Sequence, residues 1–217
     1  MLVAFDLDDT LYLERDFVFS GYHAVDNFLR KSYGIEGVQE AATQLFMKGV
    51  RTNVFDEALG RLGARISHGL VSECVEIYQD HSPVISLTTS RRAFLSAIGS
   101  CHELAIVTDG KPITQRNKIA ALGIQDFFSH IIVTGEHGDT WRKPSPLPFS
   151  RLEVLSRLFG GDCAYVADNP LKDFLGPQEL GWRVIRVRPE GGIYSHYPTP
   201  KGIPETSDTE TCLDYLP

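Results

Sequence analysis

Residues 2–10, Leu-Val-Ala-Phe-Asp-Leu-Asp-Asp-Thr, form a short apolar run that stops at a group of acidic side chains. A run of this kind, bounded by a polar turn, predicts a buried parallel strand that ends at a ligand crevice. Later stretches have the same form and predict further strands at residues 104–107, 131–133, 164–167 and 184–187. The chain therefore contains five candidate strands, and the first of them leads directly into a group of carboxylates.

Helical patterns separate these strands and carry start and stop residues. Pro112 opens one helix that Gly123 closes, while Pro144 or Pro146 opens another that ends at Gly160-Gly161. The alternation predicts an α/β fold with a doubly wound, mainly parallel sheet, in which ligands bind outside the carboxyl ends of the strands.

The stretch 15–82 breaks this alternation because it shows only helical periodicity, which predicts an inserted four-helix lid. The α/β core is then expected to comprise residues 1–14 and 83–190. Residues 191–217 are rich in Pro, Gly, Ser and Thr and show no periodicity, so we expect an extended surface tail.

Composition excludes several classes of function. The 217 residues are 42 % hydrophobic and 23 % charged, as in soluble globular proteins, and the net charge of -7 lacks the basic footprint that binds nucleic acid. The apolar residues 1–5 are too few for a signal peptide or a membrane anchor, so we expect a cytoplasmic protein without a membrane partner. Neither the four cysteines nor the seven histidines show metal-ligand spacing.

The acidic group after the first strand is the first candidate site. Alternate side chains at a strand end point the same way, so Asp6 and Asp8 can converge as two carboxylates with different tasks. Taken alone, the group is better explained as a polar turn that caps the next helix.

Three later segments favour the functional interpretation over the capping turn. Thr108-Asp109-Gly110 follows a strand and precedes a helix, an arrangement that offers a hydroxyl and backbone amides to a phosphate group. Lys143 precedes another helix, although a surface position is the default for a single lysine. Asp168 ends a strand and Asp173 follows five residues later, a pair that suits Mg²⁺ unless Asp168 only caps a helix.

In order and spacing, these four segments resemble the haloacid dehalogenase superfamily, over about residues 1–188. The resemblance implies a Rossmann-like core with a helical cap, and it makes Asp6 the nucleophile that accepts a phosphoryl group. It makes Asp8 the general acid and then the general base, because a departing alkoxide needs a proton. It further implies that Mg²⁺ is bound by the carboxylates of Asp6 and Asp168 and by the backbone carbonyl of Asp8.

The same resemblance assigns Thr108 and Lys143 to catalysis and phosphate binding, with the amides of Asp109 and Gly110 nearby. Asp173 would orient metal-bound waters or Lys143. The sequence departs from the commoner pattern at Asp109, where many members have asparagine, and at Ala167, where glycine is usual. Because an inward-pointing acid disfavours phosphate, we expect Asp109 to cap the helix that starts at Lys111.

Within the superfamily that the chain resembles, an acid at position 8 favours phosphatases and phosphomutases over dehalogenases and ion-pumping ATPases, and we expect a phosphoric monoester hydrolase. The expected substrate is a small phosphorylated metabolite, such as a sugar phosphate or a nucleotide, bound by a monomer or homodimer. A phosphomutase of the same superfamily and a non-catalytic phosphate-binding module remain alternatives. The sequence does not decide which nearby residues face the substrate; the candidates are Glu14, Arg15, Tyr22, Lys48, Arg51, Lys111, Trp141 and Arg142.

Overall fold

The computed structural model describes residues 1–64 and 67–216, and the chain divides into two compact units. The first, here called the core unit, comprises Met1–Arg15 and Ser86–Pro217. The second, here called the helical unit, comprises Asp16–Ile85.

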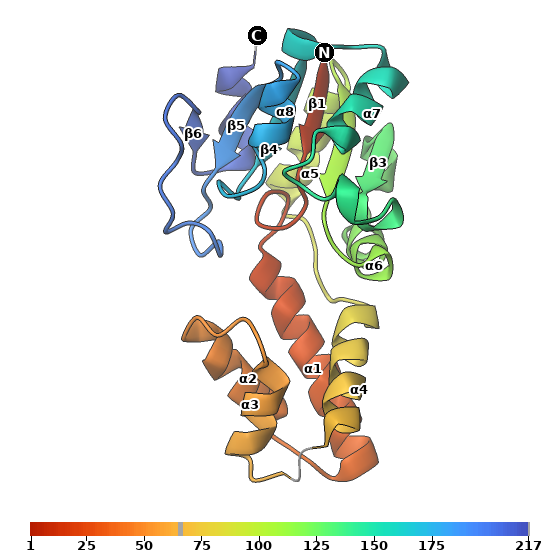
Figure 1. Ribbon diagram of the computed structural model, residues 1–217, viewed down its shortest axis with the longest axis vertical. Helices are drawn as coiled ribbons and strands as arrows, with labels where there is room; N and C mark the ends of the chain where they lie inside the picture. Colours follow the sequence, from red (N-terminus) through yellow and green to blue (C-terminus); the bar gives the residue numbers. More distant parts are fainter. Residues whose placement is uncertain (65–66, 217) are drawn as a thin grey trace. The chain divides into compact units, whose positions relative to one another are not determined.

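A parallel sheet of six strands forms the centre of the core unit (Figure 1). The strands are β1 Leu2–Phe5, β2 Glu103–Thr108, β3 His130–Val133, β4 Cys163–Ala167, β5 Arg183–Val187 and β6 Glu205–Thr206. They lie in the order β3-β2-β1-β4-β5-β6. The α/β fold class and all five predicted strands are confirmed, and β6 was not predicted.

Helices cover the sheet and connect its strands: α5 Thr89–Gly99, α6 Pro112–Leu122, α7 Leu147–Ser156 and α8 Leu175–Glu179. Short 3₁₀ turns lie between them: η1 Gln125–Phe127, η2 Thr134–Glu136, η3 Asp139–Trp141 and η4 Gly160–Asp162. Alternate residues of β1 serve opposite faces. Leu2 and Ala4 join the buried cluster that contains Phe149 of α7, whereas the Phe5 ring meets the Phe94 ring of α5 edge to face. Both faces of β1 are therefore buried, which explains its continuous apolar sequence.

Strand β1 lies between β2 and β4, at the point where the direction of strand order reverses. Phe5, its last residue, is paired with Ile106 on one side and Val166 on the other. The carboxyl ends of these three strands thus meet at one edge of the sheet, where doubly wound folds bind their ligands.

The residues at which the helices begin and end were predicted only in part. Helix α6 begins at Pro112 and ends at Gly123, which adopts the left-handed conformation expected of a C-terminal glycine. Helix α7 begins after Pro146 but ends at Ser156, before the predicted Gly160-Gly161. Arg157 takes the left-handed conformation there, with φ of 61°. A left-handed arginine gives no recognisable signal in a sequence. The predicted position of the end of α7 was wrong for that reason.

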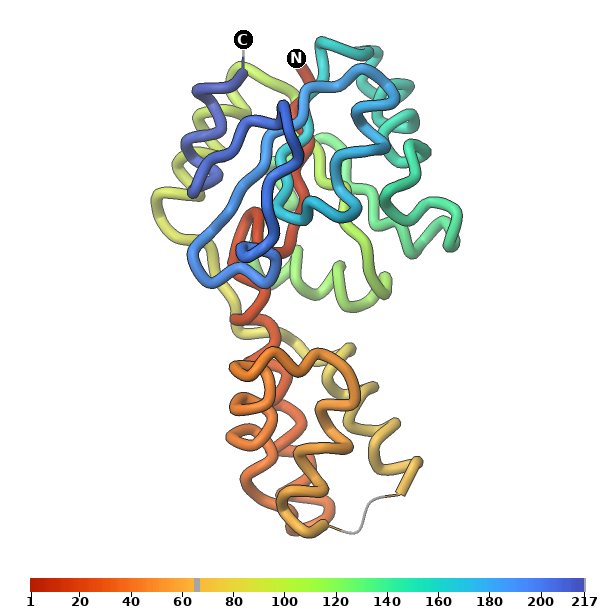
Figure 2. The backbone as a smooth tube through the Cα atoms, turned by 60° about the vertical axis from the view of Figure 1, so that its left-hand side comes forward, coloured from red at the N-terminus to blue at the C-terminus, as the bar shows by residue number. Residues whose placement is uncertain are grey.

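The segment predicted as an extended tail instead belongs to the core unit. Strand β6 extends the sheet alongside β5, and the 3₁₀ segment η5 Thr209–Tyr215 buries Cys212 completely. Figures 1 and 2 place both chain ends at the edge of the core unit where β1 begins, opposite the carboxyl ends of the strands. The pairing of β6 involves only two residues, which is too short for a periodic signal.

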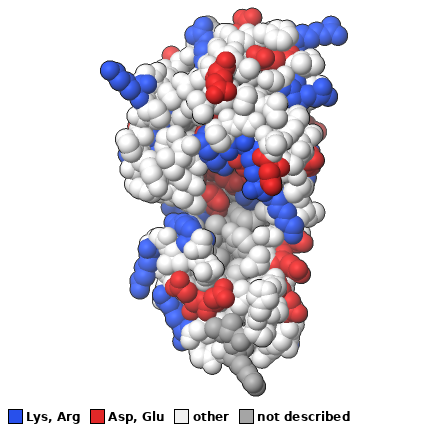
Figure 3. Space-filling model, viewed as in Figure 1, with Lys and Arg blue, Asp and Glu red and all other residues white. Residues whose placement is uncertain are grey.

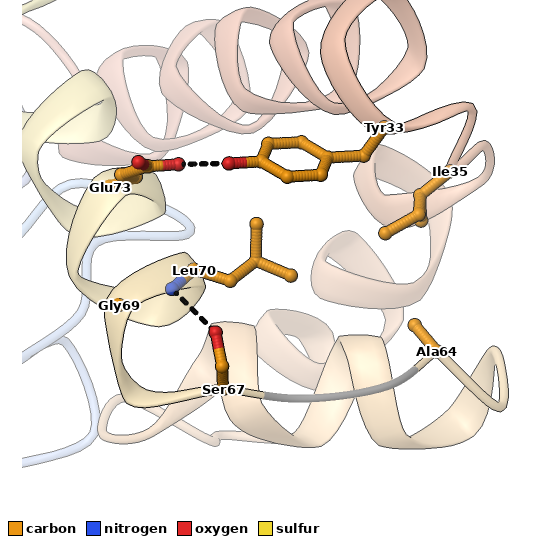
Figure 4. A pocket seen from close by; sticks show the side chains of 7 residues that line it. All are labelled: Tyr33, Ile35, Ala64, Ser67, Gly69, Leu70 and Glu73. Atoms are coloured by element: carbon orange, nitrogen blue, oxygen red, sulfur yellow. Dashed lines mark hydrogen bonds between the residues drawn. The ribbon is translucent and has the colours of Figure 1, made fainter.

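The helical unit is built from α1 Glu14–Tyr33, α2 Val38–Met47, α3 Val54–Arg61 and α4 His68–Asp80. The rings of Tyr22, Phe55 and Tyr78 contact one another between α1, α3 and α4. A cavity of about 490 Å³ lies at the other end of this unit, where the Tyr33 hydroxyl donates to Glu73 at 2.7 Å (Figure 4). Among the described residues, no helix combines the length and the apolar character needed to cross a bilayer.

Candidate active site

Asp6 lies one residue beyond β1 and is only 6 % exposed. Its backbone N–H donates to the carbonyl oxygen of Val166 in β4 at 2.9 Å, which continues the sheet pairing past the end of the strand. The carboxylate is therefore held by a rigid backbone at the centre of the sheet edge. A nucleophile needs this kind of fixed position.

Lys143 is the buried cation of the site. Its Nζ lies 2.7 Å from Asp6 Oδ1, 2.7 Å from Asp173 Oδ1 and 2.9 Å from the Tyr165 hydroxyl. Burial favours the neutral amine, but Asp173 and Asp6 outweigh it and keep the pKa of Lys143 well above its usual value. Lys143 therefore carries its charge directly beside Asp6, and the default expectation of a surface lysine does not apply.

Three carboxylates gather beside this lysine. Asp6, Asp168 and Asp173 each offer an oxygen, and these oxygens lie within 4.8 Å of one another. Burial raises the pKa of Asp168 to about 10, and repulsion from Asp6 and Asp173 adds to the effect. Burial likewise raises the pKa of Asp6, to about 6, against the attraction of Lys143. Such concentrated negative charge fits a hard cation with oxygen ligands.

The carboxylate of Asp8 is held by three side chains that the sequence did not single out. Lys118 Nζ lies 2.8 Å from both carboxylate oxygens, the Tyr12 hydroxyl donates at 2.5 Å, and Gln115 Nε2 donates at 3.2 Å. Burial raises the pKa of Asp8, but the charge of Lys118 and these hydrogen bonds lower it below its usual value overall. Asp8 is thus ionised in this state of the site.

Gln115 of α6 also organises the predicted phosphate loop. Its Nε2 donates to Thr108 Oγ1 at 2.6 Å and to the carbonyl oxygen of Asp109 at 2.8 Å. Because Thr108 accepts this bond, its hydroxyl hydrogen stays available for an incoming oxygen. Gly110 adopts φ of 147°, and a Cβ there would lie 3.0 Å from the Gln115 side chain.

Asp109 does not cap the helix at Lys111, and that prediction was wrong. The N-cap residue of α6 is Lys111, and its side chain makes no capping hydrogen bond. Asp109 instead accepts from the Thr134 hydroxyl at 2.7 Å, and Lys172 Nζ donates to it at 3.0 Å. Burial raises the pKa of Asp109, but Lys143 and Lys172 lower it overall. A cationic donor competes better for a buried carboxylate than helix amides do.

These side chains line one cavity of about 140 Å³ in the core unit. Its lining residues are Asp6, Asp8, Glu14, Thr108, Asp109, Asp168, Asn169, Lys172 and Tyr194. Acidic and basic groups lie side by side on the visible face of the molecule as well (Figure 3). The structure therefore brings the predicted residues of all four segments to one place, with Lys143 and Asp173 just behind the cavity wall.

Most of the other candidates from the sequence are not in the lining of this cavity. Tyr22 and Arg51 line a separate cavity of about 300 Å³ in the helical unit, and Lys48 is exposed. Arg142 pairs with exposed Asp139, while Trp141 packs against the buried cluster beneath α7. Of these candidates, Glu14 alone is in the lining of the 140 Å³ cavity.

Glycine at position 135 allows the phosphate loop to close. A Cβ on Gly135 would lie 2.2 Å from the carbonyl oxygen of Gly110 and 3.2 Å from Pro112. We expect Gly135→Ala to lower the free energy of unfolding by about 1–3 kcal/mol, because backbone must move to relieve the overlap. Urea unfolding measures this loss. Gly161→Ala is the matched control, since a Cβ there meets nothing within 4 Å, and equal losses for the two variants would contradict the explanation.

Comparison with known proteins now identifies the family. The model for haloacid dehalogenase-like hydrolases matches residues 1–181. The chain belongs to this family. Its predicted enzyme class, a phosphoric monoester hydrolase, is confirmed by the phosphatases among its relatives.

The relatives differ in how much of their length is matched. A glyceraldehyde 3-phosphate phosphatase of Pyrococcus abyssi is 26 % identical over 85 % of this chain and 79 % of its own. A phosphoserine phosphatase of Thermus thermophilus is 32 % identical over 64 % of this chain, which spans 57 % of that relative. Among solved structures, YfnB of Bacillus subtilis superposes with a TM-score of 0.69 at 19 % identity, covering 99 % of this chain and 97 % of its own.

A 2-haloacid dehalogenase from Pseudomonas syringae is similar in fold too, with a TM-score of 0.66 at 21 % identity, over 99 % of this chain and 96 % of its own. Fold similarity at this level therefore does not separate phosphatases from dehalogenases. The choice depends on the site, which holds a second carboxylate, Asp8, in the lining of the same cavity as Asp6.

Proposed function

We propose that this hydrolase removes phosphate from small phosphorylated metabolites with Mg²⁺, through a phospho-aspartate intermediate on Asp6. The observation that carries the proposal is the grouping of Asp6, Asp168 and Asp173 around the buried ammonium of Lys143. This group borders a cavity that also contains Asp8 and Thr108. The phosphatase relatives support the reaction type, and their different substrates leave the identity of the metabolite open.

The carboxylates of Asp6 and Asp168 are the proposed ligands of Mg²⁺, together with the backbone carbonyl of Asp8. When bound, the ion neutralises charge between the nucleophile and the phosphate group. Asp173 accepts from the backbone N–H of Asn169 at 2.9 Å and pairs with Lys143. We therefore assign Asp173 to holding Lys143 and the loop after Asp168, close to its predicted supporting role. A magnesium-bound structure has been described for the neighbour from Bacillus subtilis.

In the first proposed step, an oxygen of Asp6 attacks phosphorus and the bond from phosphorus to the leaving oxygen breaks. Lys143 neutralises the attacking carboxylate and the phosphoryl oxygens nearby, and the Thr108 hydroxyl donates to one of those oxygens. In the second step, water attacks phosphorus and releases inorganic phosphate and free Asp6.

Asp8 is proposed to move the protons of both steps. Its carboxylate suits the base that takes a proton from water in the second step. The first step needs the protonated form, and the negative phosphate group of a bound substrate raises the pKa of Asp8 toward that form. Tyr12, Gln115 and Lys118 keep the carboxylate in position throughout.

A phosphomutase would use the same residues but return the phosphoryl group to a sugar rather than to water. Phosphorus NMR of the products separates the two activities. We expect inorganic phosphate to appear from p-nitrophenyl phosphate and from a panel of sugar phosphates and nucleotides, only when Mg²⁺ is present. An isomeric phosphosugar as the main product would identify a mutase, and tight phosphate binding without turnover of any ester would identify a non-catalytic module.

The four-helix insertion is proposed to act as the lid that limits the substrates to small molecules. The helical composition of residues 16–85 is compatible with this role. The expected measurement is the same substrate panel, in which phosphorylated proteins should be hydrolysed far more slowly than small esters. Comparable rates for both would contradict a lid that excludes large substrates.

A further inference from the structure

The chain segment after β5 contributes a side chain to the catalytic cavity, although its sequence gave no sign of a role. Tyr194 is in the cavity lining, as is Asn169, the residue after the proposed metal ligand Asp168. The backbone N–H of Ile193 donates to Asp9 Oδ2 at 2.7 Å. The segment is thus bonded to the first motif and shares the cavity lining with the last.

A buried arginine fixes this segment in place. Arg186 of β5 is fully buried, and its Nη2 donates to the carbonyl oxygen of Tyr194 at 2.8 Å. Its Nη1 donates to the carbonyl oxygen of Tyr197 and to Thr199, at 2.9 and 2.7 Å. Its Nε donates to the carbonyl oxygen of Asp168 at 3.2 Å. Buried guanidinium donors are costly to leave unpaired, so the segment has little freedom to move away.

Tyr194 shares the lining of this cavity with Glu14 and Asp8. Burial raises the pKa of its phenol, and the charge of the Glu14 carboxyl group adds to the effect. Glu14 in turn lies close to Asp8, whose charge adds to the effect of burial in raising the pKa of Glu14 to about 8. Asp8 is the residue that protonates the leaving oxygen.

We propose that Tyr194 determines substrate specificity by limiting the space beside the ester oxygen, so that the site accepts phosphate esters of primary alcohols and disfavours those of secondary alcohols. The inference rests on the proposed function and names the substrate class of the same site. A cavity of about 140 Å³ leaves little room beyond the phosphate group, and a branched carbon at the ester oxygen adds bulk next to the ring. The Tyr194 side chain has only two rotatable bonds, and its backbone is anchored by Arg186. The ring therefore has little freedom to move aside.

The test uses two isomers of one composition, glycerol 3-phosphate and glycerol 2-phosphate, with the full chain in Mg²⁺. We expect kcat/KM of the wild type to favour the primary ester by about tenfold or more, the range that one misplaced carbon costs in a fitted pocket. Tyr194→Ala should bring the ratio close to one, chiefly by raising kcat/KM for the secondary ester. Tyr194→Phe keeps the ring and should keep the preference.

The controls separate specificity from folding. Tyr215→Ala removes a 42 % exposed tyrosine of the same unit and should leave the ratio unchanged. If Tyr194→Ala unfolds at a much lower temperature than the wild type, Tyr194→Val replaces it. This variant loses less packing and should change the ratio of kcat/KM in the same way. A ratio that stays within twofold of the wild type in both truncations, while p-nitrophenyl phosphate is hydrolysed, overturns the inference alone. Absence of hydrolysis of any ester by the folded wild type overturns the proposed function, and the inference with it.

Discussion

Asp6→Asn is expected to lower the rate of p-nitrophenyl phosphate hydrolysis in Mg²⁺ by at least about a thousandfold, because an amide is a poor nucleophile toward phosphorus. The fold should survive, since the amide occupies the same space and Asp6 holds the sheet edge through its backbone N–H. Steady-state kinetics and circular dichroism measure the two effects.

The matched control for this variant is Asp139→Asn, whose side chain is 93 % exposed and remote from the cavity lining. It should retain the wild-type rate. A wild-type turnover rate in a folded Asp6→Asn protein would exclude Asp6 as the nucleophile. It would also contradict the role proposed for the cluster of carboxylates.

Asp168→Asn is expected to stabilise the metal-free protein. The folded-state pKa of Asp168 is raised to about 10 from 3.8, so its contribution to stability is greatest below about pH 4 and is lost as the pH rises toward 10. Asparagine does not ionise, so the variant should gain on the wild type throughout this window, by roughly 2–4 kcal/mol at pH 8. Urea unfolding in EDTA, repeated from pH 4 to pH 9, measures the difference.

Magnesium should stabilise the wild type more than the Asp168→Asn variant. The wild type gains about 2.7 kcal/mol at a metal concentration one hundred times its Kd, whereas a variant without this ligand gains little. Identical unfolding of both metal-free proteins between pH 5 and pH 9 would contradict the electrostatic description of the site. Equal stabilisation of both by Mg²⁺ would exclude Asp168 as a ligand.

The sequence predicted the parts of this protein that depend on local pattern. Continuous apolar runs such as Leu2–Phe5 are typical of strands buried on both faces, and β1 is buried on both. Asp6, Thr108 and Asp168 each follow such a run, so a parallel sheet necessarily brings them to one edge. The pattern of apolar runs alone therefore predicts that the candidate nucleophile, phosphate ligand and metal ligand lie together.

What the sequence did not predict depends on contacts between distant segments. Gln115 and Lys118 lie on the buried face of α6 and reach Asp8 from more than one hundred positions along the chain. A polar residue on a helix carries no local sign of such a partner. Tyr194 was missed for a related reason, because its segment is anchored by hydrogen bonds from Arg186 that no local pattern indicates.

The central claim, that Asp6 carries the phosphoryl group during turnover, can be tested directly by mass spectrometry of acid-quenched enzyme. Asp8→Asn should slow the attack of water and let the intermediate accumulate with a reactive substrate such as acetyl phosphate. We predict one phosphoryl group on the peptide that contains Asp6, and its loss on treatment with hydroxylamine. Turnover without any acyl phosphate at Asp6, or a phosphoryl group found only on another residue, would contradict the claim.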